Sequence, residues 1–384
     1  MAQRKRVGLF FSYNERWIAG TYYILNIIHA LKTIETSKLP EITIITEDKA
    51  SYKKVKDDTN YPFLNYQEYP LTFPTYNLWE RLVNTVGLKL FNKKVISKSK
   101  QPKIDFLYPN EVDGINVQGI PSVNWIPDLQ ELYLPHLFSE KEIEGRKKFY
   151  ENVVLKGDVA VFSSKDSEKD FKKLYPNATI TTEVVPFAVT HPDYSSLQIS
   201  EVLKQYKLPE VYFFVPNQFW AHKNHMLVLQ ALQLLKQGGV TIHVAFSGKE
   251  LDFRNQDYVQ KIKEYVTKNK LEEQVHFLGF LDRKVQLCLM KHARAIVQPS
   301  LFEGWSTVVE DAKSLNAYLL LSNLPVHKEQ CSKNVTFFDP KEPESLAILL
   351  KKYSVEKLEI EMIPYDEDIK TFGLKFNSLV AKYT

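Results

Sequence analysis

The chain reads QPSLFEGWSTVVEDAKSL from Gln298 to Leu315. An apolar strand is predicted to end at Pro299, a loop carries Glu303-Gly304-Trp305, and a helix is predicted to begin near Thr307. A glycine loop that leads into a helix N-terminus directs several unpaired backbone N–H groups toward one point. Such a point suits a phosphate or a diphosphate.

The same alternation of strand and helix extends in both directions from this stretch. Predicted strands after residue 200 are Val211–Val215, Val240–Ser247, Val275–Leu278, Ala295–Gln298 and Tyr318–Leu321, with helices at Met226–Lys236 and Tyr258–Lys268. Predicted strands before it are Val7–Phe11, Glu41–Thr46, Ile104–Tyr108, Ser122–Ile126, Val159–Ser163 and Ile180–Pro186, with helices at Tyr22–Leu31 and Lys165–Leu174. Alternating strands and helices are typical of a parallel sheet with helices on both faces, so we expect an α/β protein.

A hinge is predicted at Ala188–Ser200, where Pro192, Asp193, Ser195 and Ser196 follow a strand. We therefore expect two α/β domains of similar size, residues 1–190 and 200–363, with a cleft between them. Residues 364–384 are expected to form a helix that crosses back to the first domain.

Composition excludes several classes of protein. With 384 residues, of which 44% are hydrophobic and 25% charged, the chain can bury a core and is not expected to be disordered. A formal charge of +4 is too small for a dedicated nucleic-acid binder. The first apolar run, Val7–Phe11, is too short for a signal or a spanning helix, and Cys288 and Cys331 cannot build a disulfide framework. We expect a soluble, cytoplasmic protein that is at most peripheral to a membrane.

The motif from Glu303 onward resembles that of family 4 glycosyltransferases. These are retaining, nucleotide-sugar-dependent enzymes with the GT-B fold of two facing Rossmann-like domains. Their pattern is an acid, seven residues and a second acid, and it typically opens with Glu-Gly and an aromatic residue. Glu303, Gly304 and Trp305 fit this opening, and Asp311 stands at the second position. The resemblance implies that Glu303 contacts hydroxyls of the donor sugar and that Asp311 holds the ribose.

Two features of this motif leave alternatives open. A glutamate is usual at the second position, and Glu310 is a competing candidate. Thr307-Val308-Val309-Glu310 reads as a capping box, which would give Glu310 a structural role, so we favour Asp311. The backbone of Gly304, Ser306 and Thr307 is expected to stabilise the leaving diphosphate together with Lys223.

A second match is Val215–Leu232, VPNQFWAHKNHMLVLQAL. In the family an Arg and a Lys about five residues apart neutralise the donor diphosphate at this place. Lys223 takes the Lys position, and Gln218 stands where the Arg is usual; an amide does not replace a guanidinium fork. His222 and His225 lack an evident third ligand, so neither a metal ion nor another cofactor is expected.

Weaker matches complete the predicted site. Gly20 fits the glycine-bearing loop between the first strand and the first helix, and Gly248 ends a strand as in the family. Phe280 belongs to HFLGFL, which resembles the segment whose backbone reads the nucleobase. Asp128 follows Pro127 where relatives often carry His-Asp, and it is the predicted acceptor-binding or base residue.

An Asp-x-Asp sequence at residues 366–368 is the metal signature of GT-A glycosyltransferases. Because it follows Pro364 in a C-terminal segment, we interpret it as an acidic helix start instead. His136 is interpreted as a loop or core residue.

The leading hypothesis is a metal-independent, retaining transfer of a hexose from a UDP- or GDP-sugar to a hydroxyl of a glycan or lipid-linked saccharide, in cell-surface polysaccharide synthesis such as capsule or lipopolysaccharide. The alternative is a catalytically degenerate nucleotide-sugar-binding subunit, since Gln218, Pro127 and Asp311 depart from the family. Tyr76–Lys103 combines an apolar helical face with a run of lysines. That segment predicts either peripheral contact with an anionic membrane or a helix packed on its own domain.

Overall fold

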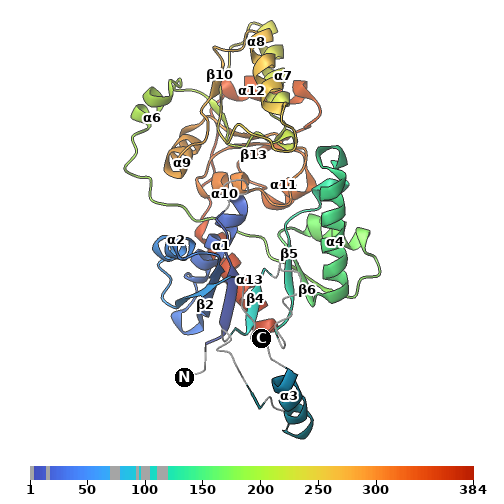
Figure 1. Cartoon of the computed structure of the whole chain (residues 1–384). Coiled ribbons are helices and arrows are strands. Elements are labelled where there is room, and N and C mark those ends of the chain that lie inside the picture. The colour runs from blue at the N-terminus through green and yellow to red at the C-terminus, as the bar shows by residue number, and fades with distance from the viewer. Residues whose placement is uncertain (1–3, 14–17, 70–77, 92–94, 97–103, 110–119) are drawn as a thin grey trace. The chain divides into compact units, whose positions relative to one another are not determined.

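The computed structural model describes residues 4–13, 18–69, 78–91, 95–96, 104–109 and 120–384 (Figure 1). The chain forms two compact units. Residues 1–123 and 373–384 make up unit 1, and residues 124–372 make up unit 2.

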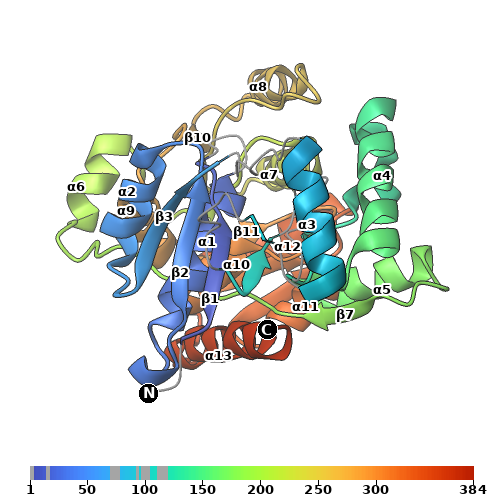
Figure 2. The same cartoon turned by 60° about the horizontal axis from the view of Figure 1, so that its bottom comes forward.

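Unit 1 contains a four-stranded parallel sheet with strand order β3-β2-β1-β4 (Figure 2). Its strands are β1 (Arg6–Phe10), β2 (Glu41–Thr46), β3 (Leu64–Glu68) and β4 (Phe106–Tyr108). Its helices are α1 (Ile18–Leu31), the 3₁₀ turn η2 (Thr36–Lys38), α2 (Lys49–Thr59), α3 (Leu78–Phe91) and the end of α13 (Asp366–Lys382). Apolar residues of β1 and β2 are buried on both faces, as a parallel sheet between helices requires.

The last helix contributes to the core of unit 1. The ring of Phe376 packs edge-on against Phe106 and Tyr108 of β4. Gly373 lies so close to α1 that a Cβ atom at this position would meet the carbonyl oxygen of Ala30 at 2.2 Å. The close crossing of α13 and α1 therefore requires glycine at residue 373.

Unit 2 begins with a three-stranded sheet, β5-β6-β7, whose observed β6–β7 ladder is parallel. The elements of this part are β5 (Val123–Ile126), η3 (Gln130–Leu132), η4 (Pro135–Leu137), α4 (Glu140–Lys156), β6 (Val159–Phe162), α5 (Lys165–Leu174) and β7 (Thr181–Val184). Ile126, Tyr150, Val153, Phe162 and Phe171 form its core. Helix α4 starts with a full capping box between Ser139 and Glu142.

The rest of unit 2 is built on a six-stranded parallel sheet with strand order β10-β9-β8-β11-β12-β13. The strands are β8 (Phe213–Val215), β9 (Val244–Phe246), β10 (Val275–Phe277), β11 (Ile296–Gln298), β12 (Leu319–Ser322) and β13 (Val335–Phe338). The helices are α6 (Ile199–Tyr206), η5 (Ala221–Lys223), α7 (His225–Gln237), α8 (Tyr258–Lys268), α9 (Arg283–His292), α10 (Thr307–Ser314), α11 (Pro325–Gln330) and α12 (Pro343–Val355). This is the doubly wound order of Rossmann folds, in which the winding direction reverses between the first and fourth strands, here β8 and β11.

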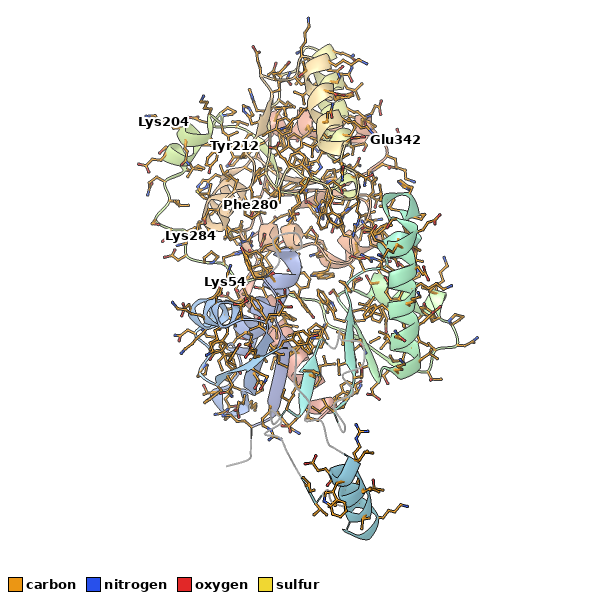
Figure 3. All side chains as sticks on the ribbon, viewed as in Figure 1. Lys54, Lys204, Tyr212, Phe280, Lys284 and Glu342 are labelled. Carbon is orange, nitrogen blue, oxygen red and sulfur yellow. The ribbon has the colours of Figure 1, made fainter. Side chains whose placement is uncertain are left out.

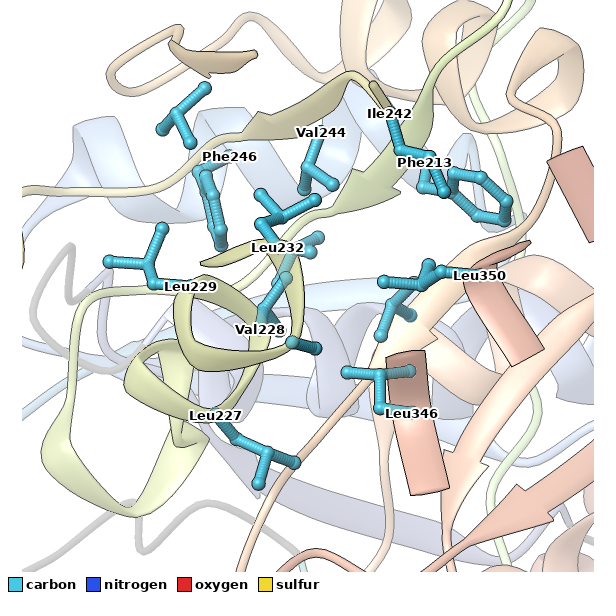
Figure 4. Packing of buried hydrophobic residues seen from close by; sticks show 14 of the residues in the cluster. Phe213, Leu227, Val228, Leu229, Leu232, Ile242, Val244, Phe246, Leu346 and Leu350 are labelled. Carbon is cyan, nitrogen blue, oxygen red and sulfur yellow. The ribbon is translucent and has the colours of Figure 1, made fainter. Parts of the chain in front are cut away.

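Alternation along the strands distributes side chains to two cores. Phe213 and Val215 of β8 pack with α7 and α12, as Figure 4 shows for Phe213, Leu232, Leu346 and their neighbours. Phe214 points to the opposite face and packs with α6, α9 and α10. Helices therefore cover both faces of the sheet, and the α/β class expected from the sequence is confirmed.

The local predictions agree with the structure where periodicity was strong. β2, α5 and α8 have the predicted bounds, and the other predicted strands are present, most of them shortened by one to five residues. Helices α2, α4, α6, α9, α11 and α12 and strands β3 and β13 were not predicted. The predicted domain boundary near residue 190 and the crossing of residues 364–384 stay predictions.

Candidate functional site

The two strands at the reversal point end side by side, and their last polar residues are bonded to each other. Asn217, just after β8, donates from Nδ2 to Oε1 of Gln298 at the end of β11, at 2.8 Å. In open parallel sheets ligands bind beyond the carboxyl ends of the strands at such a reversal. The segments that follow β8 and β11 carry Lys223 and Glu303, so the fold brings the two predicted catalytic residues together.

Lys223 and Glu303 form a mostly buried ion pair. Nζ of Lys223 donates to Oε1 of Glu303 at 2.6 Å, and the exposed fractions of the two side chains are 16% and 8%. Ser300 Oγ and Gln298 Nε2 donate to the same oxygen at 2.6 and 2.8 Å. Burial by itself raises the pKa of Glu303, but its electrostatic and hydrogen-bonding partners, Lys223 first among them, together outweigh burial and lower the pKa to about 2. Glu303 is therefore ionised at neutral pH, and only one of its two oxygens takes these three bonds.

The turn that carries Lys223 is held from three sides. The buried carboxylate of Asp252 accepts the N–H of Ala221 at 2.8 Å, and the carbonyl oxygen of His222 accepts the N–H of Leu301 at 2.8 Å. Asn224 adopts a left-handed conformation, and its Nδ2 donates to the carbonyl oxygens of Pro299 and Pro340. These bonds tie the Lys223 turn to the loop of Glu303, so the ion pair is preorganised.

Gly304 brings the loop of Glu303 against the segment that follows β5. A Cβ atom at position 304 would lie 2.1 Å from the carbonyl oxygen of Pro127 and 2.8 Å from Cβ of Asp128. Glycine is required here because of this close approach of two backbones. The structure thus places the predicted acceptor residue Asp128 beside the predicted donor loop.

Arg146 of α4 holds Asp128 in place. Its Nη1 donates to Oδ1 of Asp128 at 3.0 Å and to Oε2 of Glu131 at 2.9 Å. Burial lowers the pKa of this guanidinium, but the nearby acidic groups, Asp128 first and then Tyr150 and Glu131, together more than offset the effect, so the net shift of the Arg146 pKa is upward. The arginine stays charged, and the Asp128 side chain, 29% exposed, keeps access to solvent.

Gly248, Gln218 and Phe280 lie around the ends of β8, β9 and β10. Gly248 has a φ of +146°, and a Cβ there would meet the carbonyl oxygen of Asn217 at 2.3 Å and Cα of Gln218 at 2.8 Å. The N–H of Gly248 donates to the carbonyl oxygen of Gly279 at 2.9 Å. Phe280, labelled in Figure 3, follows β10 with 61% of its surface exposed. These three predicted donor-binding residues therefore lie along one edge of the sheet.

Helix α10 starts one residue earlier than the predicted capping box requires. Its N-cap is Ser306, whose Oγ accepts the N–H of Val309 at 3.4 Å. A Thr307–Glu310 capping box was therefore wrong, because Thr307 is already the first helical residue. The N–H of Ser306, one of the groups expected to bind the diphosphate, donates instead to Oε1 of Gln330 at 3.1 Å.

Both candidates for the second acid are buried and paired. Asp311 accepts from Arg283 through both oxygens, at 2.8 and 2.5 Å. Glu310 accepts from Tyr365, Gln330 and Lys313, and burial raises its pKa above the usual range. The role of Asp311 at the ribose stays a prediction.

The remaining predicted residues lie elsewhere. Trp305 turns to the segment after β7, where its Nε1 donates to the carbonyl oxygen of Phe187 at 3.0 Å. Gly20 was predicted in a loop, but it is the third residue of α1, because the helix begins four residues earlier than the apolar spacing indicated. Gly20 belongs to unit 1, whereas the other predicted site residues belong to unit 2.

His222 and His225 are buried groups of the aromatic core around the site. His225 stacks on Phe219 with ring centroids 4.4 Å apart. Burial lowers the pKa of each imidazole to about 3, so both are neutral. Within the part of the chain that the structure describes, no group of three or more His, Cys, Asp or Glu side chains could hold a metal ion. Asp366, Glu367 and Asp368 open α13, as interpreted from the sequence.

Two arginines of the site escaped the sequence analysis. Arg283 begins α9 and holds Asp311, and Arg254 pairs with Glu142 at 3.1 Å while its charge contributes to the lowered pKa of His222. The guanidinium carbon of Arg254 lies 5.9 Å from the centre of the Trp220 ring, and Trp220 directly precedes the turn that carries Lys223. Neither residue has a local signal, since their partners are 28 and 112 residues away in the chain.

Comparison with known proteins finds a family that matches the second half of the chain. Residues 198–364 match the family described as glycosyl transferases group 1. The O-antigen chain mannosyltransferase RfbU of Salmonella typhimurium is 22% identical over 316 residues, which cover 82% of this chain and 76% of the relative.

Solved structures resemble the whole chain at low sequence identity. A glycosyltransferase from Rickettsia africae has a TM-score of 0.61 at 14% identity and covers 100% of this chain and 94% of its own. HepE of Anabaena, solved in complex with UDP and glucose, has a TM-score of 0.60 at 14% identity, with 99% and 95% covered. At this identity the likeness shows a shared GT-B fold.

Proposed function

Because this chain is a glycosyltransferase whose residues 198–364 belong to group 1, we propose that it transfers a hexose from a UDP- or GDP-sugar to a hydroxyl of a glycan or lipid-linked saccharide. The observation that carries the proposal is the Lys223–Glu303 pair at the reversal point of the sheet, next to Asp128. The O-antigen mannosyltransferase relative supports a place in cell-surface polysaccharide synthesis.

In the proposed reaction Glu303 receives hydroxyls of the donor sugar, since one of its oxygens takes no part in the three bonds described above. Lys223 supplies the positive charge that the diphosphate needs as the bond between the anomeric carbon and the phosphate oxygen breaks. With Arg254 close by, the protein's own cations can serve this role without a metal ion.

We propose that the acceptor hydroxyl attacks from the face that the diphosphate leaves, with retention of configuration. Its proton passes to the departing phosphate oxygen, and Asp128 orients the hydroxyl. This assignment rests on the charge of Asp128 and its contact with the Gly304 loop.

The test is a panel of UDP- and GDP-sugars, offered without metal and with or without mannose-terminated acceptors. Thermal stabilisation by one donor together with release of its nucleotide, both diminished in Lys223→Met and the release lost in Glu303→Ala, supports the transferase. Stabilisation without release, even with acceptors present, refutes it in favour of a nucleotide-sugar-binding subunit.

We also propose that α3 contacts an anionic membrane at the inner face. Its apolar stripe is exposed to solvent: Leu78 by 81%, Trp79 by 71%, Leu82 by 61% and Val86 by 53%. The opposite side of α3 contacts the chain itself: Oδ1 of Asn84 accepts the N–H of Ile96 at 2.8 Å, and its Nδ2 donates to the carbonyl oxygen of Ile96 at 3.0 Å. These exposures favour the membrane over packing of the stripe on its own unit.

Charge selects the lipid in this proposal. Lys89 lies in the last turn of α3, and the sequence continues with Lys93, Lys94, Lys98, Lys100 and Lys103, which lie outside the described residues. Among the described residues, no helix has the length and apolar character needed to cross a bilayer. Co-sedimentation with vesicles of 30% phosphatidylglycerol, weakened by salt and by Trp79→Ala with Leu82→Ala, is the expected result. Equal binding to neutral vesicles refutes the proposal.

A further inference from the structure

An aromatic pair lies beside the proposed reaction centre and has no role in donor chemistry. Tyr133 follows η3, five residues after Asp128, and Phe302 directly precedes Glu303. The ring centroids are 5.4 Å apart and the ring planes differ by 31°. Tyr133 is 53% exposed and its neighbour Leu132 is 44% exposed. Packing of the core does not require a tyrosine ring that is half exposed, so the ring is available for binding a ligand.

The tyrosine ring is held rigidly although it is exposed. Its hydroxyl donates to Oδ1 of Asp170 on α5 at 2.5 Å. This bond raises the pKa of Tyr133 to about 12, so the phenol stays protonated and the bond persists at neutral pH. A ring anchored at one end and exposed along its face loses little conformational entropy when a ligand stacks on it.

Polar groups stand on the same two segments as the pair. Asp128 lies five residues before Tyr133 in the chain and close to Gly304, two residues after Phe302. Arg146 donates to Asp128, and each of these two charged side chains is 29% exposed. The carboxylate can accept hydroxyl protons and the guanidinium can donate to hydroxyl oxygens. Aromatic faces beside a few placed polar groups are the usual lining of a small-ligand site.

We infer that Tyr133 and Phe302 form the stacking platform for the pyranose ring that is accepting the new sugar. A pyranose has one face of C–H groups and a rim of hydroxyls. The C–H face suits the negative face of an aromatic ring, and the rim suits Asp128 and Arg146. A lipid chain would instead need an apolar groove free of these charges. The inference rests on the proposed function and adds the acceptor subsite to it.

The position of the platform fits this role. Phe302 is joined to Glu303, and Gly304 contacts Pro127 and Asp128. A sugar on the platform therefore lies next to both the residue proposed to hold the donor and the residue proposed to orient the acceptor. Stacking there brings an acceptor hydroxyl to the anomeric carbon without using the donor contacts.

The experiment compares Tyr133→Ala, Phe302→Ala and Tyr133→Phe in the full chain. Each alanine variant is expected to raise the acceptor KM by about tenfold or more while donor KM stays within about twofold. Tyr133→Phe keeps the ring and is expected to recover most of the lost affinity. Leu155→Ala, on the exposed side of α4, is the control for substitution of a large surface residue.

A binding readout separates this inference from the proposed function. Saturation-transfer NMR of methyl α-D-mannopyranoside and methyl α-D-glucopyranoside, with UDP or GDP present, detects a stacked pyranose without turnover. Signals at the ring C–H protons that disappear in Tyr133→Ala support the platform even if no transfer is found. Equal signals in wild type and Tyr133→Ala, or an equal loss in Tyr133→Ala and Tyr133→Phe, overturn it.

Discussion

Replacement of Glu303 by glutamine should destabilise unit 2 in a pH-dependent manner. The carboxylate accepts from Lys223, Ser300 and Gln298, and its pKa is lowered from 4.5 to about 2. At about 1.4 kcal/mol per pH unit, this lowering corresponds to about 3 kcal/mol of stability in the ionised form. Removal of one member of a buried pair commonly costs about 3–5 kcal/mol, which is consistent with that value.

The pH dependence of this stability follows from the downward shift of the Glu303 pKa. A carboxyl whose folded pKa lies below its unfolded pKa adds stability that is complete above about pH 4.5 and disappears as the pH falls toward 2. We therefore expect Glu303→Gln to melt roughly 6–12 °C lower than wild type at pH 7. The two melting temperatures should converge between pH 4.5 and the lowest pH at which the protein stays folded.

The assay is thermal unfolding of both proteins from pH 3 to pH 8 at constant ionic strength. Glu361→Gln is the matched control, because the Lys333–Glu361 pair is more than half exposed and should contribute about 0–1 kcal/mol. Lys223→Met with Glu303→Gln should cost less than the two single changes added together. A difference that is constant with pH, or smaller than that of the control, would refute an ionised, buried Glu303.

Three further outcomes follow from the same geometry. Gly304→Ala should lower the melting temperature and abolish transfer, because the added Cβ would lie 2.1 Å from the carbonyl oxygen of Pro127. Gly145→Ala is the control, since an added Cβ there has no atom within 4 Å and should stabilise α4 by about 0.5–1 kcal/mol. Equal melting temperatures of the two variants would contradict the prediction. Glu310→Gln should melt within a few degrees of wild type at pH 7, since burial already disfavours the ionised form of Glu310. Wild type should gain stability relative to this variant as the pH falls through the raised pKa of Glu310. A large loss of stability in the variant at pH 7 would contradict a raised pKa. Arg283→Met should lower the free energy of unfolding by about 3–5 kcal/mol, because it leaves the buried Asp311 without its arginine partner. Adding Asp311→Asn should recover part of this loss. Chemical denaturation of both variants measures the effect, and no recovery would contradict a direct pair.

The predictions that succeeded rest on short-range patterns. Apolar runs and helical spacing indicated β2, α5 and α8 with their observed bounds. Periodicity is a property of neighbouring residues, so it is visible without the fold. α4 and α12 were missed, although Ser139 and Glu142 form a capping box that the sequence already contains as a readable signal.

The candidate site was predictable only in part. The strand, glycine loop and helix after residue 298 indicated where Glu303 stands, and the resemblance supplied Lys223 and Asp128. The error at the start of α10 has a local cause, because Ser306 and Thr307 are both good N-caps and only the backbone geometry distinguishes them. The misplacement of Gly20 also has a local cause, because α1 begins at Ile18, before the apolar periodicity that marked its predicted start at Tyr22.

By itself, the amino-acid sequence determined the α/β class, the alternation of strands and helices and the positions of the acid and lysine motifs, because each depends on residues close together in the chain. Only the tertiary structure decided the strand order that reverses between β8 and β11, the pairing of Arg283 with Asp311, and the contact of Gly304 with Pro127. These features depend on which segments far apart in the chain come into contact, and local propensity carries no information about such contacts. The buried charges of the site acquire their pKa values from those contacts, so its chemistry is a property of the fold.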